Sequence, residues 1–392
     1  MRPIGLLLGV GFLIIMTTSA KDSGKYLNRD VWRLENRVLR VSVTQVGGHI
    51  AELVLKGEGE VNPLWQQARP TIDPTEFDPK KHSELYGSGS GARLMSGLLG
   101  HNLCFPYWGD PSEPEFRAGM TYHGETGIVR WTKVSEQSRS EEMSLTLSAE
   151  LPESRTRFVR TLSLLKGHPV VYFDERAENL TSLDRPVGWC EHVTVGPPFL
   201  EKAVTVFDAS LTVGRMLGDA SGASVQWPEG RAEKVINLRT VRDIPQSGFV
   251  NNFLVDPTRE FGYFTAVNPK MNLLLGYLFR RQDFRWLNVW EANIPASANQ
   301  PPMLTRGLEF SNTPTHGSLK ALVKVESLFD TPAFEWLDAR SSLSKKFCAF
   351  TARTPDGFLG VQQIQIKDDA LEIVEKDRGR TVRVSFDRAR LR

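Results

Sequence analysis

The sequence predicts an all-β protein built as one large antiparallel β-sandwich, and three observations support this. Short runs with period-two alternation of apolar and polar residues recur along the chain, broken by Gly, Pro, Asn and Asp. No amphipathic helices that would support alternating strand–helix units are visible. The strand signal covers about 300 residues without a fixed-period repeat, which favours a sandwich over a small barrel, a propeller or a β-helix.

The alternating runs begin near Val31. They read RVLRVSVTQVGGHIAELVL (37–55), MSLTLSAEL (143–151), FVRTLSLLKGHPVVYFDERAEN (158–179) and KALVKVESLF (320–329). Residues 62–94 and 290–302 are predicted to be long loops, which in a compact domain usually serve as functional rims or lids. In residues 332–347 the apolar residues recur with a period typical of a helix. After Thr351 the pattern predicts a strand pair joined by KDRGR.

The chain therefore divides into an N-terminal segment of residues 1–20, a sandwich domain of residues 27–350, and a small C-terminal β extension of residues 351–392. The first segment, MRPIGLLLGVGFLIIMTTSA, has an arginine at its second position, continues with an apolar run and ends in small residues. This layout is typical of a secretory signal peptide. The apolar run is shorter than the roughly 20 residues that a membrane span needs.

We thus expect cleavage near Ala20, export to the periplasm or the extracellular space, and no membrane attachment afterwards. An uncleaved N-terminal anchor is the alternative. The net charge of +2, with 24% charged residues, shows no basic patch and predicts no nucleic-acid partner. Three widely spaced cysteines allow at most one intramolecular disulfide and lack metal-finger spacing. The oligomeric state is left open.

Candidate acid–base residues occur in three informative contexts. His101 lies in GHNLCFPYWG, His123 in TYHGETGIVRW and His192 in WCEHVTVGPPFL. The acids of interest are Glu125, Glu191 and Glu309, the last within MLTRGLEFSNTP.

Strand alternation separates these candidates. In a strand His192 shares a face with Cys190 and Thr194, whereas Glu191 points to the opposite face. Glu191 is therefore expected to be structural. Beside Glu309, the small Gly307 is expected to leave space that a ligand could occupy.

Structural roles explain each of these residues as well. A histidine in a strand is more often hydrogen-bonded in the core or at its rim than catalytic. The aromatic group Phe105, Tyr107 and Trp108 is more often core than a sugar-stacking platform. Composition and spacing alone leave the function open.

Five segments together resemble the aldose 1-epimerase, or galactose mutarotase-like, superfamily, including its hexose-phosphate 1-epimerase branch. They are GHIAELVL (48–55), LCFPYWG (103–109), HGETGIVRW (123–131), VVYFDERAENLTSLDRPVGWCEHVTVGPPF (170–199) and RGLEFSNTP (306–314). Their order and spacing are similar to the family's over most of the chain. The resemblance implies a β-supersandwich with a sugar-binding cleft.

The resemblance also implies an isomerase that interconverts sugar anomers by acid–base ring opening, without a cofactor. It makes Glu309 the base, His192 the acid and His123 a second donor. We expect the substrate, a mono- or oligosaccharide, to contact further side chains. These are Arg93, Tyr107, Trp108, Glu125 and Trp290.

The departures from the family pattern concern phosphate binding. Leu98-Leu99-Gly100 and His123-Gly124-Glu125-Thr126-Gly127 stand where the phosphate branch has arginines. Arg93 and Arg130 lie nearby but out of register. A phosphorylated sugar is therefore not expected.

Two alternatives to an epimerase remain open at this point. The first is a carbohydrate-binding protein of the same fold without turnover. The second is a metal site formed by His123, Glu125 and His192, since three such ligands and a water suit zinc. The sequence lacks a compact ligand motif, and the prediction is that no metal is bound.

Overall fold

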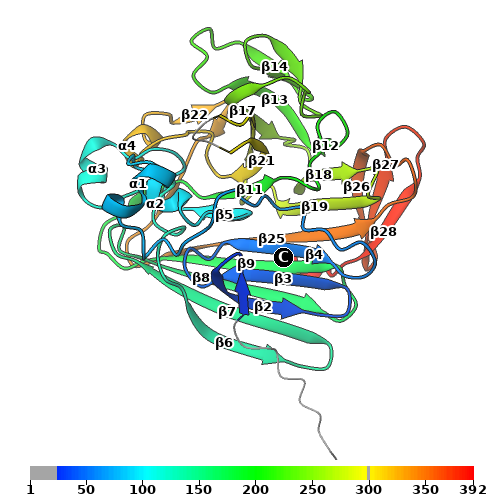
Figure 1. Cartoon of the computed structure of the whole chain (residues 1–392), viewed down its shortest axis with the longest axis horizontal. Helices are drawn as coiled ribbons and strands as arrows, with labels where there is room; N and C mark the ends of the chain where they lie inside the picture. Colours follow the sequence, from blue (N-terminus) through cyan, green and yellow to red (C-terminus); the bar gives the residue numbers. More distant parts are fainter. Residues whose placement is uncertain (1–23, 298–300) are drawn as a thin grey trace, which may run out of the picture.

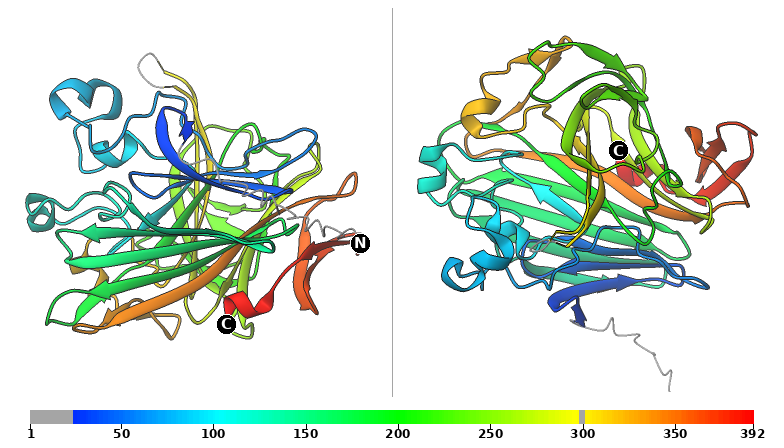
Figure 2. Two further views of the ribbon diagram at one scale, coloured as in Figure 1. Left: turned by 90° about the horizontal axis from the view of Figure 1, so that it is seen from below. Right: turned by 45° about the horizontal axis from the view of Figure 1, so that its top comes forward.

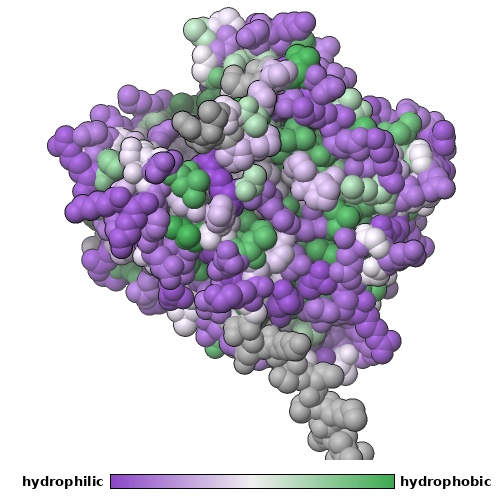
Figure 3. Space-filling model, in the orientation of Figure 1, coloured by the Kyte–Doolittle hydropathy of each residue, from purple (hydrophilic) through white to green (hydrophobic). Residues whose placement is uncertain are grey.

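The computed structural model describes residues 24–297 and 301–392. It confirms the predicted all-β class: two large antiparallel sheets lie face to face (Figures 1 and 2). The predicted signal peptide lies outside the described residues. No helix within the described ranges has the length and apolar character needed to cross a membrane. The face seen in Figure 3 is hydrophilic over most of its periphery, with hydrophobic side chains toward its middle.

The larger sheet carries the residues of interest and has eleven strands. In spatial order these are β1 (Gly24–Tyr26), β2 (Arg29–Glu35), β3 (Leu39–Thr44), β4 (Ile50–Leu55), β5 (His101–Cys104), β11 (Cys190–Val195), β21 (Met303–Ser311), β20 (Trp286–Ile294), β17 (Gln246–Val255), β13 (Leu211–Met216) and β14 (Ser224–Gln226). β11 and β21 are adjacent although more than a hundred residues separate them in the sequence, and together they form the middle of the sheet.

The second sheet has eight strands. In spatial order these are β12 (Val206–Ala209), β18 (Phe261–Asn268), β19 (Leu273–Arg280), β25 (Ser342–Arg353), β9 (Val170–Asn179), β8 (Thr156–Leu165), β7 (Glu142–Leu151) and β6 (Thr132–Ser138). The main hydrophobic core lies between the two sheets, where Phe310 of β21 and Phe347 of β25 pack against each other. Small two-stranded sheets complete this part. They pair β10 (Arg185–Val187) with β24 (Glu335–Leu337), β15 (Glu229–Arg231) with β16 (Val235–Asn237), and β22 (Ser327–Leu328) with β23 (Thr331–Pro332).

The C-terminal extension contains three strands instead of the predicted pair. They are β26 (Val361–Lys367), β27 (Ala370–Glu375) and β28 (Thr381–Ser385), followed by the short 3-10 helix η1 (Arg388–Leu391). The extra strand arises because Asp368, in the left-handed region (φ 48°), turns the chain into a tight hairpin that the sequence analysis missed. This sheet packs on the outer face of the eight-stranded sheet, away from the α-helices (Figure 1).

The predicted loop 62–94 includes two helices, α1 (Pro79–Tyr86) and α2 (Ala92–Met95). Asp78 caps α1 through its side chain, which accepts the Lys80 N–H, and Pro79 occupies the first helical position. Asp-Pro is a helix-start signal that the sequence analysis did not use. Two more short helices, α3 (Glu113–Arg117) and α4 (Leu319–Leu322), lie on the same side of the molecule (Figure 1). The strand predicted from the alternating run 320–329 is wrong, because α4 covers its start and only the two residues of β22 are extended.

Two further predictions are wrong. The predicted loop 290–302 begins inside β20, which pairs with β21 along its whole length from Trp286 to Ile294. Residues 332–347, where the sequence has a helical period, contain no helix: they run from the end of β23 through β24 into β25. In both cases backbone pairing with a neighbouring strand decides the structure, and such pairing depends on residues far away in the sequence.

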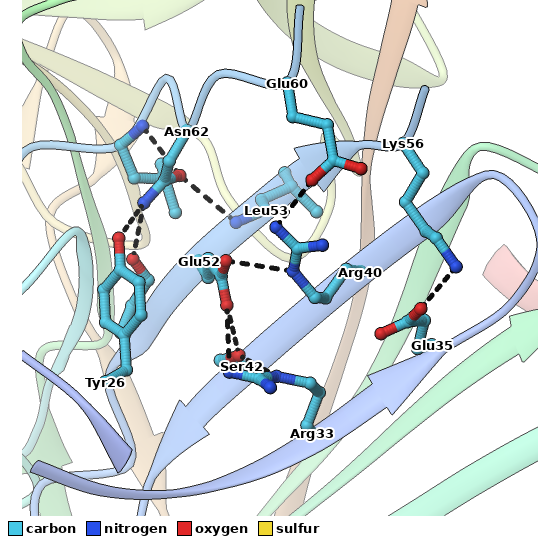
Figure 4. Close-up of polar contacts among 12 residues, drawn as sticks. Tyr26, Arg33, Glu35, Arg40, Ser42, Glu52, Leu53, Lys56, Glu60 and Asn62 are labelled. Carbon is cyan, nitrogen blue, oxygen red and sulfur yellow. Dashed lines mark hydrogen bonds and ion pairs between the residues drawn. The ribbon is translucent and has the colours of Figure 1, made fainter. Parts of the chain in front are cut away.

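The N-terminal strands fix the chain segment that leads to the candidate site (Figure 4). Glu52 of β4 is buried and accepts hydrogen bonds from Arg40 Nε (3.0 Å) and Ser42 Oγ (2.6 Å). Asn62, just after β4, donates through Nδ2 to Tyr26 Oη (3.0 Å) and accepts from the Leu53 N–H (3.2 Å). These bonds place residues 63–65 against the end of β11.

Candidate active site

A cavity of about 260 Å³ opens on the outer face of the eleven-stranded sheet, the face turned away from the main core. Its lining combines side chains of the sheet with others from the loops and from α2. The described lining residues are Trp65, Met95, Leu98, Trp108, Tyr122, His123, His192, Thr194, Gly248, Val250, Trp290, Met303, Glu309 and His316. The structure thus brings together five of the predicted site residues: Trp108, His123, His192, Trp290 and Glu309.

Strand register positions His192 and Glu309. They are direct cross-strand partners in β11 and β21, so their side chains leave the same face of the sheet side by side. The Nε2 atom of His192 lies 3.1 Å from Oε1 of Glu309. Thr194, the next residue on that face of β11, has its Oγ1 3.2 Å from Nδ1 of the histidine.

Burial controls the charge of this pair. It lowers the pKa of His192 to about 3, with smaller contributions in the same direction from His316 and His101. It also raises the pKa of Glu309 well above the ordinary 4.5. Because a low-dielectric site disfavours both charged forms, the pair holds a single proton and is neutral as a unit.

Two polar atoms at the bottom of the cavity lack a hydrogen-bond partner within the described chain. They are Oε2 of Glu309 and the indole N–H of Trp108, both buried. Leaving such groups unpaired costs about 1–3 kcal/mol each. A ligand hydroxyl can satisfy both, because it accepts a hydrogen bond from the indole and donates one to the carboxylate.

His123 enters the cavity from a tight turn. Its φ of 65° lies in the left-handed region, and Gly124 follows with φ 77°. A Cβ at Gly124 would lie 2.1 Å from the Phe105 carbonyl oxygen, so only glycine fits there. His123 Nδ1 accepts the Gly109 N–H at 2.9 Å, which places the ring proton on Nε2. Burial, His192 and His316 lower the pKa of His123 well below 6.5, so the ring is a neutral donor.

This turn also explains why Glu125 lies elsewhere. In a regular strand His123 and Glu125 would share one face, as predicted, but the two left-handed residues break the alternation. The Glu125 carboxylate is buried and accepts the backbone N–H groups of Glu153 and Ser154, both at 2.8 Å. The grouping of His123, Glu125 and His192 is therefore not assembled. Within residues 24–297 and 301–392, no group of three or more His, Cys, Asp or Glu side chains could hold a metal ion.

Two more residues that we expected to contact substrate do not line the cavity. The hydroxyl of Tyr107 is buried and donates to the Thr121 carbonyl at 2.6 Å. Arg93 lies in α2, and its Nε donates to the Pro74 carbonyl at 2.9 Å. Both side chains hold neighbouring loops in place.

The structure corrects the expectation at Gly307 and agrees with the one at Glu191. A Cβ at Gly307 would lie 2.6 Å from Oε1 of Glu309 and 3.1 Å from Trp290, so protein atoms already fill the space beside this glycine. Glu191 faces the core, as strand alternation predicts. It accepts hydrogen bonds from the indole N–H of Trp189 (2.9 Å), and its other oxygen lies 2.8 Å from His101 Nε2.

Sequence reasoning missed several lining residues. Tyr122 and His316 are hydrogen-bonded to each other, with Oη and Nε2 3.1 Å apart, and His316 packs edge-on against Trp108. The backbone N–H of Trp65 donates to the Thr194 carbonyl at 2.8 Å, which holds this residue in place. One signal could have pointed to His316: it follows Glu309 by seven residues, in the loop that leaves the same strand at the cavity rim.

The sequence matches no protein-family model and no curated protein. Solved structures do match. A provisionally assigned aldose 1-epimerase from Klebsiella pneumoniae aligns over 83% of this chain and 80% of its own, with 12% identity and a TM-score of 0.60. One from Escherichia coli covers 82% and 99%, with 12% identity and a TM-score of 0.55. A galactose mutarotase-like protein from Lactobacillus casei covers 82% and 100%, with 11% identity and a TM-score of 0.51.

The chain has the galactose mutarotase-like fold. This agrees with the resemblance seen in the sequence. At such low identities the likeness establishes the architecture alone.

Proposed function

We propose that this protein is an aldose 1-epimerase-like enzyme that interconverts the anomers of a reducing sugar. The observation that carries the proposal is the buried His192–Glu309 pair, whose Nε2 and Oε1 atoms lie 3.1 Å apart at the bottom of the cavity. The cavity volume of about 260 Å³ lies below the range of about 300–1,000 Å³ typical of drug-sized ligands. This favours a ligand of about one sugar ring.

The chemistry of ring opening suits a close acid–base pair. The two oxygens that exchange protons, O1 and the ring oxygen, are both bonded to C1, so the groups serving them must also be neighbours. Nε2 of His192 and Oε1 of Glu309, 3.1 Å apart, meet this requirement. The reaction is an isomerisation without net oxidation, so the residues need only move protons.

The proposed steps begin when the shared proton moves onto His192 and leaves Glu309 as a carboxylate. Glu309 removes the proton of the anomeric hydroxyl, and the electron pair forms the C1 carbonyl. The C1–ring oxygen bond breaks, and His192 protonates the departing oxygen. Rotation about C1–C2 and the reverse steps close the ring on the other face. The indole N–H of Trp108 and Nε2–H of His123 serve as hydrogen-bond donors to substrate oxygens.

Glu309→Gln tests this proposal. Loss of the base should slow catalysed mutarotation by about 10²–10⁴-fold, the usual contribution of one proton transfer. Polarimetry or NMR of freshly dissolved aldoses measures the rate, with the uncatalysed rate subtracted. Glu150→Gln, at an exposed position on β7, is the control and should leave the rate unchanged. A broad aldose panel without acceleration by the wild-type protein would contradict the proposal.

The aromatic lining supports a second candidate function, carbohydrate binding without turnover. Trp65, Trp108, Tyr122 and Trp290 offer ring faces and edges of the kind that pack against sugar C–H groups. A binding protein should retain its affinity after Glu309→Gln and should accelerate no aldose. Glycan-array binding measured alongside the polarimetry separates the two functions.

We also propose that the mature protein is exported, on the basis of the signal-like residues 1–20. Its proposed partner is a sugar, and neither nucleic acid nor, after cleavage, a membrane. Expression of the full chain followed by N-terminal sequencing tests this. A mature N-terminus near Lys21 in the periplasmic or secreted fraction is expected, and an intact Met1 in the membrane fraction would contradict export.

A further inference from the structure

The cavity has a buried polar floor and a predominantly apolar mouth. Trp108, His123, His192 and Glu309 form the floor, and each is less than 10% exposed. The half-buried residues around the opening include two with polar groups, Tyr122 and His316, and the others are apolar. The apolar ones are Met95, Leu98, Val250, Trp290 and Met303.

Strand register places part of this mouth directly beside the acid–base pair. Two residues along each strand from His192 and Glu309, on the same face, lie Thr194 and Gly307. Gly307 pairs with Trp290 of β20, and Trp290 pairs with Val250 of β17. A sugar whose C1 lies over the pair therefore meets a predominantly apolar row two residues along the strands, about 7 Å away.

The cavity also lacks positive charge. No Arg or Lys occurs among its described lining residues. His123, His192 and His316 have pKa values lowered by burial, so they are neutral at physiological pH. An anionic sugar would bring its charge into this buried site without a cation to pair with it.

These features select among substituents at one position of the sugar. In an aldohexopyranose C6 is the only carbon outside the ring, and it is attached next to the ring oxygen that His192 would protonate. We propose that the preferred substrate is a neutral 6-deoxyaldose, whose C6 is a methyl group packed against Val250 and Trp290. This inference rests on the proposed function and names its substrate class.

The sharpest test uses sugars that differ only at C6. D-Fucose, D-galactose and D-galacturonate carry a methyl, a hydroxymethyl and a carboxylate group on the same ring. Both kcat/KM for mutarotation and Kd by tryptophan fluorescence should be measured for each sugar. We expect D-fucose to exceed D-galactose by about tenfold in kcat/KM, the lower end of discrimination by an apolar pocket. D-Galacturonate should fall at least another tenfold lower.

A variant tests which residues cause the preference. Val250→Thr replaces a methyl with a hydroxyl of similar size at the cavity mouth. The ratio of kcat/KM for D-fucose over D-galactose should fall toward one. Val134→Thr, at a position on β6 that is 61% exposed, is the matched control and should keep the wild-type ratio.

The outcomes separate this inference from the proposed function. Equal kcat/KM and Kd for D-fucose and D-galactose, or a preference for D-galactose, overturn the 6-deoxyaldose inference but leave the epimerase proposal intact. Tighter binding of D-fucose without turnover of any aldose supports the substrate class and overturns the epimerase proposal.

Discussion

Among single residues, His192 and Glu309 show how burial can prepare a proton-transfer site without any net charge. Each group alone would be costly to ionise in this cavity, and together they need only one proton. The surrounding residues preserve this state: Thr194 lies beside Nδ1 of the histidine, and no cation from the described chain lines the cavity. The pair therefore resembles a single titrating unit with two macroscopic pKa values.

The pH dependence of activity follows from this unit. Adding a second proton removes the base, and burial lowers the pKa of that step below the ordinary 6.5 of histidine. Removing the only proton removes the acid, and burial raises the pKa of that step above the ordinary 4.5 of a glutamic acid. We expect a bell-shaped profile of kcat/KM whose acid limb lies well below pH 6.5.

The measurement is polarimetry across pH 4–10, with the enzyme-free rate subtracted at every pH because acid and base also catalyse mutarotation in water. An acid limb with its midpoint at about 6.5, the ordinary imidazole value, would show that His192 titrates as a solvated residue and would contradict the neutral pair.

The element that most directly shapes the cavity is the end of β11. The Gly-Pro-Pro sequence that ends the strand begins with Gly196, whose N–H donates to the Pro63 carbonyl at 3.2 Å. Leu64 forms a bridge with Val195, and Trp65 then enters the cavity. The strand end thus acts as a docking edge for the loop that carries Trp65.

Gly196→Ala tests this docking. An added Cβ would lie 2.6 Å from Cδ1 and 2.9 Å from Cα of Trp65, so the loop must move. We expect a loss of about 1–3 kcal/mol in the free energy of unfolding and an increase in KM, measured by denaturant titration and polarimetry. Gly89→Ala is the control because no atom lies within 4 Å of its added Cβ. Unchanged values for Gly196→Ala would show that Trp65 is not held by this contact.

The same elements show how far sequence reasoning reaches. Alternation placed His192 and Glu191 on opposite faces because β11 is a regular strand. It failed for His123 and Glu125 because two consecutive residues with positive φ reverse the chain there. Trp65, Tyr122 and His316 come from loops and turns, whose positions depend on tertiary contacts that no local pattern encodes.

At the level of the whole molecule, the overall architecture was predictable because it depends on many strands at once. The prediction of the all-β class and of the sandwich is correct although the predictions for residues 290–302 and 332–347 are wrong. One wrong element changes little in a structure with two large sheets. The small third sheet was predicted only as a strand pair. It forms a second hydrophobic cluster with the outer face of the eight-stranded sheet, on the opposite side of the sandwich from the cavity.

Leu371→Ala probes that second cluster. Leu371 of β27 is fully buried in it, so its truncation should cost about 2–5 kcal/mol of unfolding free energy. The kinetics of the folded fraction should not change, because the sandwich separates this residue from His192. Denaturant unfolding and polarimetry give both quantities, and Val134→Ala at the exposed surface should change neither. A mutarotation defect at full stability would contradict this separation.

The direct cross-strand pairing of His192 and Glu309 has a consequence for redesign. The spacing of the two groups is set by the hydrogen-bonded distance between neighbouring strands, about 4.7–4.9 Å, and does not depend on any loop. The loops bearing Trp65 and His316 can therefore be exchanged while His192 and Glu309 stay in place, whereas the turn bearing Tyr122 must be kept because it also carries His123. A library that varies only those loops over a constant β11–β21 platform should yield proteins that share one reaction and differ in the sugar they accept.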